Sequence, residues 1–388
     1  MPLRSSLNRS AFEEQRRMAM MTRRTFITTA ATTGLGAAGV LMFHSFSQGR
    51  SEYEQAVKQL WRHGERGSSD APAVLRELVR YATLAPSSHN TQCWKFRLGD
   101  RSISILPDYQ RRCPIVDPDD HHLFVSLGCA AENLVQAASA LGFRGEAVFN
   151  SGTNESLEIS LVRATAVRTP LFEAIPRRQS TQAEFDAKPL STDELRRLET
   201  AGSGHGIRVH LLTDRRAMEN VLDFVVQGNT AQMRDPAFVR ELKHWLRFNG
   251  GQATRQGDGL FSGASGHPTA PSWLGGLLFD GFFTEKAEND QYARQVRSSA
   301  GIAVLVSERE DKPHWIEAGR AFQRFALQAT AMEVRTAHLN PPVEVVSLRP
   351  RFAQSIGLSG GRPDLVIRFG RGPERPRSLR RPVDAVIL

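Results

Sequence analysis

Cysteine is scarce in this sequence, with three residues in 388: Cys93, Cys113 and Cys129. None of them stands in a CxxC or CxxH spacing, so the sequence carries neither a zinc motif nor a disulfide framework. An odd number of cysteines also leaves at least one thiol free. We expect buried thiols that pack as small hydrophobic side chains.

Tyrosine is also rare, with 4 residues against 21 phenylalanines and 5 tryptophans. Apolar residues make up 40% and charged residues 23%, which excludes global disorder and supports a large core in one pseudo-symmetric domain or two ordinary domains. The net charge of +9 is spread in separate arginine pairs, with no basic stripe that carries interleaved aromatics. We therefore expect no nucleic-acid partner, and a phosphate-bearing small ligand explains some arginines better.

The N-terminal region lacks a clear A-x-A cleavage motif before Ser51. Arg23 and Arg24 nevertheless precede an uncharged stretch that runs to Met42, which resembles a twin-arginine (Tat) export signal. The expected partner is the Tat translocase, and the expected location is the periplasm or the outer side of the membrane. Residues 26–46 are also long enough to anchor the chain in a bilayer. A basic tail followed by a weak helix is the third interpretation.

The spacing of apolar residues predicts helices and strands that follow one another along the chain. A helix after Asp70 should end at Ala85, since the following proline disfavours helical geometry there. Ser191 or Thr192 can cap a further helix. The other predicted helices are 121–141 and 315–332, and the predicted strands are 102–106, 158–162, 207–211, 300–306 and 365–369.

Two segments of the sequence repeat in the same order. The APSSHN of residues 85–90 matches AGSGHG at residues 201–206, and Leu127-Gly128 matches Ala318-Gly319. The repeat predicts two fused copies of one fold, residues 51–170 and 171–388, behind a signal or anchor at 1–50.

The second copy contains a long insertion. Residues 249–285 are rich in glycine, yet they also hold Phe261, Trp273, Phe279 and Phe283. A linker would not carry this apolar load, so we interpret the segment as a lid over a site. A hairpin domain or an interface arm is the alternative.

Four motifs carry a resemblance to the nitroreductase superfamily. LAPSSHNTQCWKF is similar to its APSxxNxQPWxF loop, and IPRRQSTQAEF to the RRSxRxF opening of a repeat. NPPVEV and SLRRPVDAVI resemble its flavin-edge loop and C-terminal basic segment. With the Tat-like signal, the fused halves and the lid, the chain resembles the Acg-like branch. The resemblance implies an α+β nitroreductase fold that binds FMN between two copies, here as an intrachain pseudodimer.

The resemblance also implies where FMN would bind. Arg177, Arg178 and Ser180 would hold the phosphate with Arg380 or Arg381. Taken alone, these arginines would be interpreted as surface residues, and the 85–90 segment as a simple turn. Pro86, Ser87, Ser88, Asn90 and Gln92 would surround the ribityl chain and pyrimidine, and Asn340, Pro341, Pro342, Val343 and Glu344 would lie along the isoalloxazine edge.

The second potential flavin site is degraded, because glycines 202, 204 and 206 replace Pro86, Ser88 and Asn90. One FMN per chain is therefore expected. Cys93 stands where the family has proline, and Gln182 where it has arginine. His89 is the candidate proton donor, with a structural histidine as the alternative, and no metal site is expected.

The expected function is an oxidoreductase that passes hydride through flavin N5 to an electrophilic small molecule, such as a nitroaromatic, a quinone or an enone. Its electron donor is unknown. A flavin-sequestering protein with a lid over the cofactor is the alternative, because an exported protein would lack NAD(P)H. A membrane-anchored interaction protein with an inactive fold is a third class.

Overall fold

The computed structural model describes residues 37–64 and 70–388. The chain divides into two compact units, Met1–Gly49 and Arg50–Leu388. Most of the expected export signal lies outside the described residues, and helix α3 (Ala37–Leu60) contains the rest. One described helix, α5 (His121–Ala140), is long and apolar enough to cross a membrane, but it is buried in the protein core.

The first sheet has four antiparallel strands in the order β1-β2-β4-β3. These are β1 (Trp94–Leu98), β2 (Ser102–Pro107), β3 (Phe143–Asn150) and β4 (Ser156–Arg163). Alternate side chains of β2 and β4 are buried, as expected for a sheet with one face on the core. The two strands predicted in this half are β2 and β4, while β1 and β3 were not predicted.

The second sheet repeats this order as β5-β8-β10-β9, again antiparallel. It consists of β5 (Ile207–Leu212), β8 (Gly301–Ser307), β9 (Arg335–His338) and β10 (Arg362–Gly370). Every residue of β8 and β10 is buried, because apolar clusters cover both faces of these central strands. When the strands are counted in chain order, the fourth strand of each sheet lies between the second and the third.

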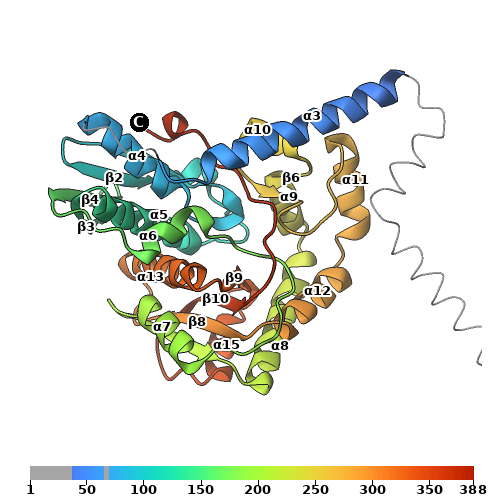
Figure 1. The fold of residues 1–388 in the computed structure, drawn as a ribbon. Helices are drawn as coiled ribbons and strands as arrows, with labels where there is room; N and C mark the ends of the chain where they lie inside the picture. Colours follow the sequence, from blue (N-terminus) through green and yellow to red (C-terminus); the bar gives the residue numbers. More distant parts are fainter. Residues whose placement is uncertain (1–36, 65–69) are drawn as a thin grey trace, which may run out of the picture. The chain divides into compact units, whose positions relative to one another are not determined.

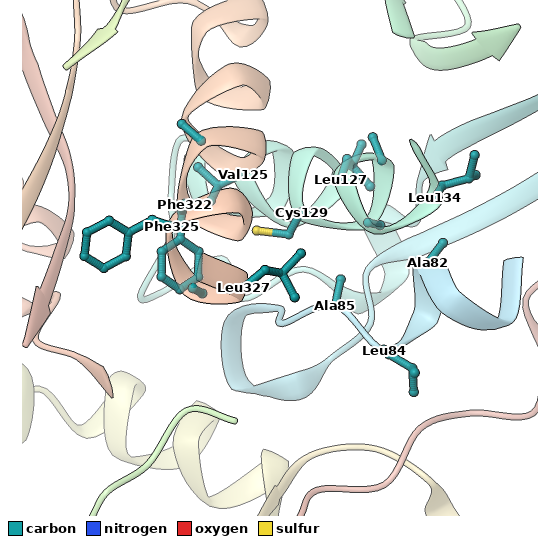
Figure 2. Packing of buried hydrophobic residues seen from close by; sticks show 14 of the residues in the cluster. Ala82, Leu84, Ala85, Val125, Leu127, Cys129, Leu134, Phe322, Phe325 and Leu327 are labelled. Carbon is teal, nitrogen blue, oxygen red and sulfur yellow. The ribbon is translucent and has the colours of Figure 1, made fainter. Parts of the chain in front are cut away.

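Helix α5 and helix α13 (Lys312–Ala331) pack against each other between the two sheets (Figure 1). Their backbones meet at two glycines. A Cβ on Gly128 would lie 2.0 Å from the carbonyl oxygen of Ile316, and one on Gly319 would lie 1.9 Å from that of Val125. The two contacts are reciprocal, as in a pseudo-two-fold crossing. Figure 2 shows the apolar packing around this crossing, with Val125 and Cys129 on α5 and Phe322 and Phe325 on α13.

Each half also has a helix that precedes its first strand. α4 (Ala71–Thr83) packs on α5, and α7 (Thr192–Gly202) packs on α13. The predicted cap of α7 is Ser191, which forms a capping box with Glu194. A loop with left-handed residues follows each helix, with φ of 46° at His89 and 53° at His205.

The two halves differ most between their first and second strands. A short turn joins β1 to β2, whereas residues 213–300 separate β5 from β8 (Figure 1). The loop predicted at 249–285 is wrong in detail, because short helices and strands form there. The connection contains α8 (Arg215–Met233), α9 (Pro236–Trp245), β6 (Leu246–Arg247), α10 (Gly250–Gln256), β7 (Leu260–Phe261), α11 (Ser272–Phe282) and α12 (Glu285–Arg297).

The C-terminal segment returns to the first half (Figure 1). After β10 it reaches β1, where Ile387 forms a parallel bridge with Phe96. The remaining elements are short and connect the larger ones. They are α6 (Pro170–Ala174), α14 (Pro341–Glu344), α15 (Arg349–Ser355), and the 3-10 turns η1 (Ser88–Asn90), η2 (Tyr109–Arg111), η3 (Ile175–Arg177) and η4 (Val383–Ala385).

Candidate functional site

A cavity of about 670 Å³ lies where both halves and the insertion meet. Its volume falls within the range of roughly 300–1,000 Å³ that is usual for small-molecule and cofactor sites. Its lining includes the loop after α4, helix α5, the residues after η3, the β9–α14 connection, the C-terminal segment and the insertion. The predicted site residues that line it are Pro86, Ser87, Ser88, His89, Asn90, Arg178, Ser180, Asn340, Pro341, Glu344 and Arg380.

Asn90 joins three of these segments. Its side-chain amide donates to the carbonyl oxygens of Gly259 in the insertion, at 2.9 Å, and Leu379 in the C-terminal segment, at 3.1 Å. A φ of 53° turns its backbone into the left-handed region, which asparagine tolerates better than most residues. Its buried Oδ1 has no hydrogen-bond partner within residues 37–64 and 70–388. A buried acceptor without a partner is costly, so a ligand that donates a hydrogen bond would stabilise it.

Gln92 does not line the cavity, contrary to prediction. Its side chain is completely buried and donates to the carbonyl oxygen of Gly257 at 2.9 Å. Its Oε1 accepts from the backbone amide of Arg381 at 2.8 Å. Gln92 therefore fastens the loop to the insertion and the C-terminal segment rather than contacting a ligand.

Two buried arginines form the cationic part of the cavity. Arg178 is 3% exposed and donates to the Leu84 carbonyl oxygen at 3.3 Å. Arg380 is 9% exposed and donates to the carbonyl oxygens of Thr83 and Ala85, at 2.8 and 3.0 Å. Among the described residues neither guanidinium has a carboxylate partner. Burial lowers the pKa of Arg178 to about 10, and burial and the charge of Arg178 lower that of Arg380.

The neighbouring arginines lie elsewhere. Arg177 is exposed, and its guanidinium donates to the carbonyl oxygen of Glu173 in its own helical turn at 3.5 Å. Arg381 donates to the Ala385 carbonyl oxygen at 2.7 Å. Neither residue lines the cavity, so the structure does not bring Arg177 and Arg381 together with the other predicted phosphate residues. Adjacent side chains in a chain project in different directions. Here Arg178 and Arg380 project into the cavity, whereas Arg177 and Arg381 do not.

The β9–α14 connection contributes only part of its predicted set. Pro341 and Glu344 line the cavity, whereas Pro342 and Val343 do not, because Val343 is packed into a separate apolar cluster. Glu344 accepts from Gln232 Nε2 of α8 at 2.7 Å. Burial raises the pKa of the Glu344 carboxyl group.

His89, the predicted proton donor, lines the cavity but is poorly suited to this role. Its Nδ1 lies 3.4 Å from the sulfur of Cys113. Burial and the charge of His122 lower the pKa of His89 to about 4, so its ring is neutral near pH 7. A neutral imidazole can still donate one hydrogen bond, but it holds no labile proton of the kind a general acid needs.

His122 is a cavity residue that the motif comparison did not select. It lies in the first turn of α5 and is 6% exposed. Its Nδ1 is 3.5 Å from an oxygen of Asp117, and its Nε2 is 3.4 Å from the side-chain amide of Asn340. Burial opposes its charged form, but Asp117 outweighs burial and raises the pKa of His122. The adjacent aspartates and histidines in the sequence were the signal that could have indicated it.

The insertion supplies the apolar side of the cavity. Phe238, Phe248, Phe279 and Phe283 line it, and the rings of Phe279 and Phe283 stack with centroids 4.5 Å apart. Glu288 of α12 also faces this space, and burial raises the pKa of its carboxyl group to about 7. The lid predicted at 249–285 therefore contributes to the cavity together with the flanking helices α8, α9 and α12.

Two groups of side chains have possible metal-ligand atoms within 4.8 Å of one another. One group is His89 with Cys113 and Glu241, and the other is Asp117 with His121 and His122. In each group the carboxylate already accepts two backbone amides at 3.0 Å. We assign no metal to either group.

All three thiols are free and buried, as expected. Cys93 does not line the cavity, whereas Cys129 does, with its sulfur donating to the Gly319 carbonyl oxygen at 3.2 Å. Burial raises the pKa of both thiols. A thiol thus adjoins the cavity, but from α5 and not from the loop position that the family motif singled out.

The loop of the second half does not adjoin a comparable space. His205 is exposed, and a Cβ on Gly206 would lie 3.1 Å from the ring of His314. A hollow of about 210 Å³ near this loop is lined by Ser203 and by residues of β5.

Comparison with known proteins gives relatives of one kind, although no family model matches the sequence. The chain is 25% identical over 311 residues to "Putative NAD(P)H nitroreductase Rv3131" of Mycobacterium tuberculosis, which covers 78% of this chain and 86% of that protein. It is 22% identical over 330 residues to "Putative NAD(P)H nitroreductase acg" of the same species, with 81% and 95% covered. This similarity supports a place for the chain in the nitroreductase superfamily.

Solved structures show weaker likenesses. A nitroreductase with bound FMN from Desulfitobacterium hafniense is 12% identical and has a TM-score of 0.37, with 57% of this chain and 98% of that chain covered. The FMN-dependent nitroreductase NfnB from Mycobacterium smegmatis, solved with NADPH, is 12% identical with a TM-score of 0.34, and 52% and 87% are covered. At these scores the likenesses do not by themselves establish a shared fold.

Proposed function

We propose that this protein binds one FMN in the cavity, with the phosphate held by Arg178 and Arg380. The observation that carries the proposal is the buried pair of guanidinium groups, which have no carboxylate partner in the part of the chain that the structure describes. A buried charge is strongly unfavourable unless an opposite charge compensates it. A phosphate would supply that charge and would accept from the buried Nε of Arg178, which has no partner.

The remaining lining also fits FMN. Ser87, Ser88, Asn90 and Ser180 offer short polar side chains, and the Oδ1 of Asn90 is an unpartnered buried acceptor. The insertion offers an apolar aromatic surface on which a planar ring could stack. When bound, FMN would supply hydride chemistry, while the protein's own residues would bind it, orient it and exclude water.

The function that follows is that of a flavin-dependent oxidoreductase of the nitroreductase type, acting on an electrophilic small molecule such as a nitroaromatic, a quinone or an enone. Both mycobacterial relatives are named as NAD(P)H nitroreductases. The relatives' names do not specify the acceptor, so the acceptor class is part of the proposal.

We also propose that residues 51–170 and 171–388 are two fused nitroreductase-like halves that share this single site. The repeated strand order and the reciprocal Gly128 and Gly319 contacts support a duplication. Glycines 202, 204 and 206 in the second loop, and the small hollow beside it, support one FMN per chain.

Flavin binding is tested by a matched pair of neighbouring arginines. Arg178→Ala should weaken FMN binding about 10- to 150-fold, since a hydrogen bond to a charged group is worth roughly 1.5–3 kcal/mol. Arg177→Ala should leave the FMN dissociation constant unchanged, because Arg177 lies outside the cavity. Fluorescence titration of the flavin-free protein measures both constants. Equal effects in the two variants would place the phosphate elsewhere.

Flavin sequestration without turnover is the second candidate function, and the aromatic insertion on the cavity favours it. Absorbance spectroscopy separates the two. Rapid bleaching by NADPH and reoxidation by a nitroaromatic or quinone would support the enzyme. A yellow protein that is inert to both would support sequestration, and a colourless protein that cannot be reconstituted would contradict FMN binding.

Export is a separate proposal, supported by the Tat-like sequence around Arg23 and Arg24. Cell fractionation should find the chain outside the cytoplasm, either free or anchored through residues 26–46. Replacement of both arginines by lysine should retain it in the cytoplasm.

A further inference from the structure

One face of helix α12 forms a polar wall of the cavity. Four of its residues line the cavity at spacings of three and four positions, which places them on one side of the helix: Glu288, Gln291, Tyr292 and Gln295. Helix α8 packs beside α12 and adds the amide side chains of Asn229 and Gln232. Among the described residues, the lining from these two helices includes no lysine, arginine or histidine. The α12 wall therefore offers hydrogen-bond acceptors, and its only charge is negative.

Glu288 is the residue on this wall whose charge is not compensated. Its carboxylate has no hydrogen-bond or ion-pair partner in the part of the chain that the structure describes, and burial is the cause that raises its pKa to about 7. Glu344 differs, because its Oε2 accepts from Gln232 Nε2 at 2.7 Å and His122 lies close enough to stabilise its charge. A partly buried carboxylate without a partner is unfavourable, so a cationic ligand would stabilise Glu288.

A second acceptor on the wall also lacks a partner. Gln295 lines the cavity two helical turns after Glu288 and is 2% exposed. Its Nε2 donates to the Gln182 carbonyl oxygen at 3.1 Å, which holds the amide in place. Its buried Oε1 has no hydrogen-bond partner within the described ranges. A buried acceptor of this kind is satisfied when a ligand donates a hydrogen bond to it.

The insertion places an aromatic surface at the same end of α12 as Glu288. Phe283 directly precedes Thr284, the N-cap of α12, and Glu288 belongs to the first turn of that helix. Phe283 lines the cavity together with Phe279, and the two rings stack with centroids 4.5 Å apart. A ligand that joins an aromatic or quinonoid ring to a cationic group can therefore contact both the apolar and the anionic parts of this region.

We propose that the α12 wall is the subsite for the electron acceptor, and that it selects acceptors whose ring carries a protonated amine. The ammonium group binds Glu288, and the Oε1 of Gln295 accepts from a second donor of the acceptor roughly 10 Å away, the length of two helical turns. The proposal rests on the flavin-dependent function proposed above and specifies the acceptor within it. Arg178 and Arg380 attract a phosphate, whereas the α12 wall repels one, so the two ligands are sorted within one cavity.

Unreactive probes test the charge preference without turnover. Benzylamine, benzyl alcohol and benzoate share a ring and differ in the charge of one substituent. The full chain loaded with FMN should bind benzylamine about 10- to 150-fold more tightly than benzyl alcohol, the usual effect of a hydrogen bond to a charged group. Benzoate should bind most weakly. Titrations followed by the flavin absorbance spectrum, at a pH above the Glu288 pKa of about 7, measure the dissociation constants.

Variants of α12 assign the preference to one carboxylate. In Glu288→Gln the benzylamine and benzyl alcohol constants should agree within a factor of about 3. Glu288→Asp keeps the charge and should restore part of the preference. Asp290→Asn is the matched control, because Asp290 lies on the same helix outside the cavity, is 53% exposed and pairs with Lys286. This control should keep the full preference for benzylamine.

The same contact should appear as substrate selectivity. 4-Nitrobenzylamine and 4-nitrobenzyl alcohol form the corresponding pair of reducible acceptors. Glu288→Gln should lower kcat/KM for the amine about 10- to 150-fold, mainly through KM, because the carboxylate holds the ammonium group before and during the reaction alike. The loss for the alcohol should be much smaller, since it carries no charge.

The outcomes separate the two proposals. A chain that binds FMN but binds benzylamine no more tightly than benzyl alcohol would overturn the amine subsite alone. A preference that persists in Glu288→Gln would also overturn it, because the cation would then bind elsewhere. A chain that cannot be loaded with FMN would overturn the proposed function. Calorimetry of the flavin-free chain with benzylamine then decides the subsite, which fails if Glu288→Gln binds the amine as tightly as the unchanged protein does.

Discussion

At the residue scale, Glu288 is a carboxylic acid whose protonation is coupled to folding. Burial raises its pKa to about 7 from a usual value of 4.5. The folded state then binds more protons than the unfolded state between these values, so this group lowers the free energy of unfolding as pH rises from about 4.5 to 7. Glu288→Gln should remove this pH-dependent loss of stability. We expect a change of up to about 2 kcal/mol in the free energy of unfolding, after allowance for the partial exposure of the side chain.

Urea unfolding across this pH range measures the effect. The curve of the Glu288→Gln variant should be flatter than that of the unchanged protein, and the exposed Glu52→Gln should leave the curve unaltered. A variant that keeps the original slope would show that the Glu288 carboxyl group is well solvated.

Single residues also show the limit of motif comparison. The RR pair at 177 and 178 resembles a phosphate-binding motif, but only Arg178 faces the cavity. The same division separates Arg380 from Arg381. Sequence alone cannot resolve this, because the direction of each side chain depends on the turn η3 and on the path of the C-terminal segment. His122 was missed because it lies outside the motifs that carry the family resemblance, although its partner Asp117 is close in the sequence.

At the scale of elements, the crossing of α5 and α13 depends on two glycines. Gly319→Ala should place a methyl group 1.9 Å from the carbonyl oxygen of Val125, which forces the helices apart at the centre of the core. Overpacking of a core costs about 1–3 kcal/mol and can exceed this where backbone is the obstacle. We expect a loss of at least 3 kcal/mol in denaturant unfolding.

Gly152→Ala is the matched control, because a Cβ there meets nothing within 4 Å. Wild-type stability in the Gly319→Ala variant would show that the two helices can separate slightly without loss of packing, and would weaken the pseudo-two-fold crossing as a fixed feature of the fold.

Strands were predicted where apolar alternation is strong. The predicted strands at 102–106 and 300–306 lie within one residue of β2 and β8. β3 has Phe143, Gly145, Ala147 and Phe149 on its half-buried face, and Arg144 and Glu146 on its exposed face. It was missed because glycine and alanine, which are rare in strands, occupy two of the four inward positions. Its eight-residue pairing with β4, and not its own sequence, fixes it in the sheet.

At the scale of the whole molecule, the C-terminal segment ties the second half to the first. Phe96 donates to the Val386 carbonyl oxygen and accepts from the Leu388 amide, both at 2.8 Å, and Val386 is 1% exposed. Deletion of residues 386–388 should lower the free energy of unfolding by about 2–4 kcal/mol, from two backbone hydrogen bonds and one buried valine.

Urea unfolding of the truncated chain checks this value. Leu388→Ala is the control, since the side chain is 61% exposed and the backbone bonds remain. An unaltered unfolding midpoint in the truncated chain would show that the segment is held by Leu379 and Arg380 alone.

The sequence by itself indicated the fold class through the nitroreductase resemblance, and it predicted the helices α4, α5, α7 and α13, because short contiguous motifs and apolar periodicity are local properties. It also indicated the cavity loop, since residues 85–90 belong to a short motif that resembles a nitroreductase loop. Only the tertiary structure decided which arginines face inward and which parts of the insertion line the cavity. Those features depend on contacts between segments hundreds of residues apart, such as that of Asn90 with Leu379, and no local pattern records them.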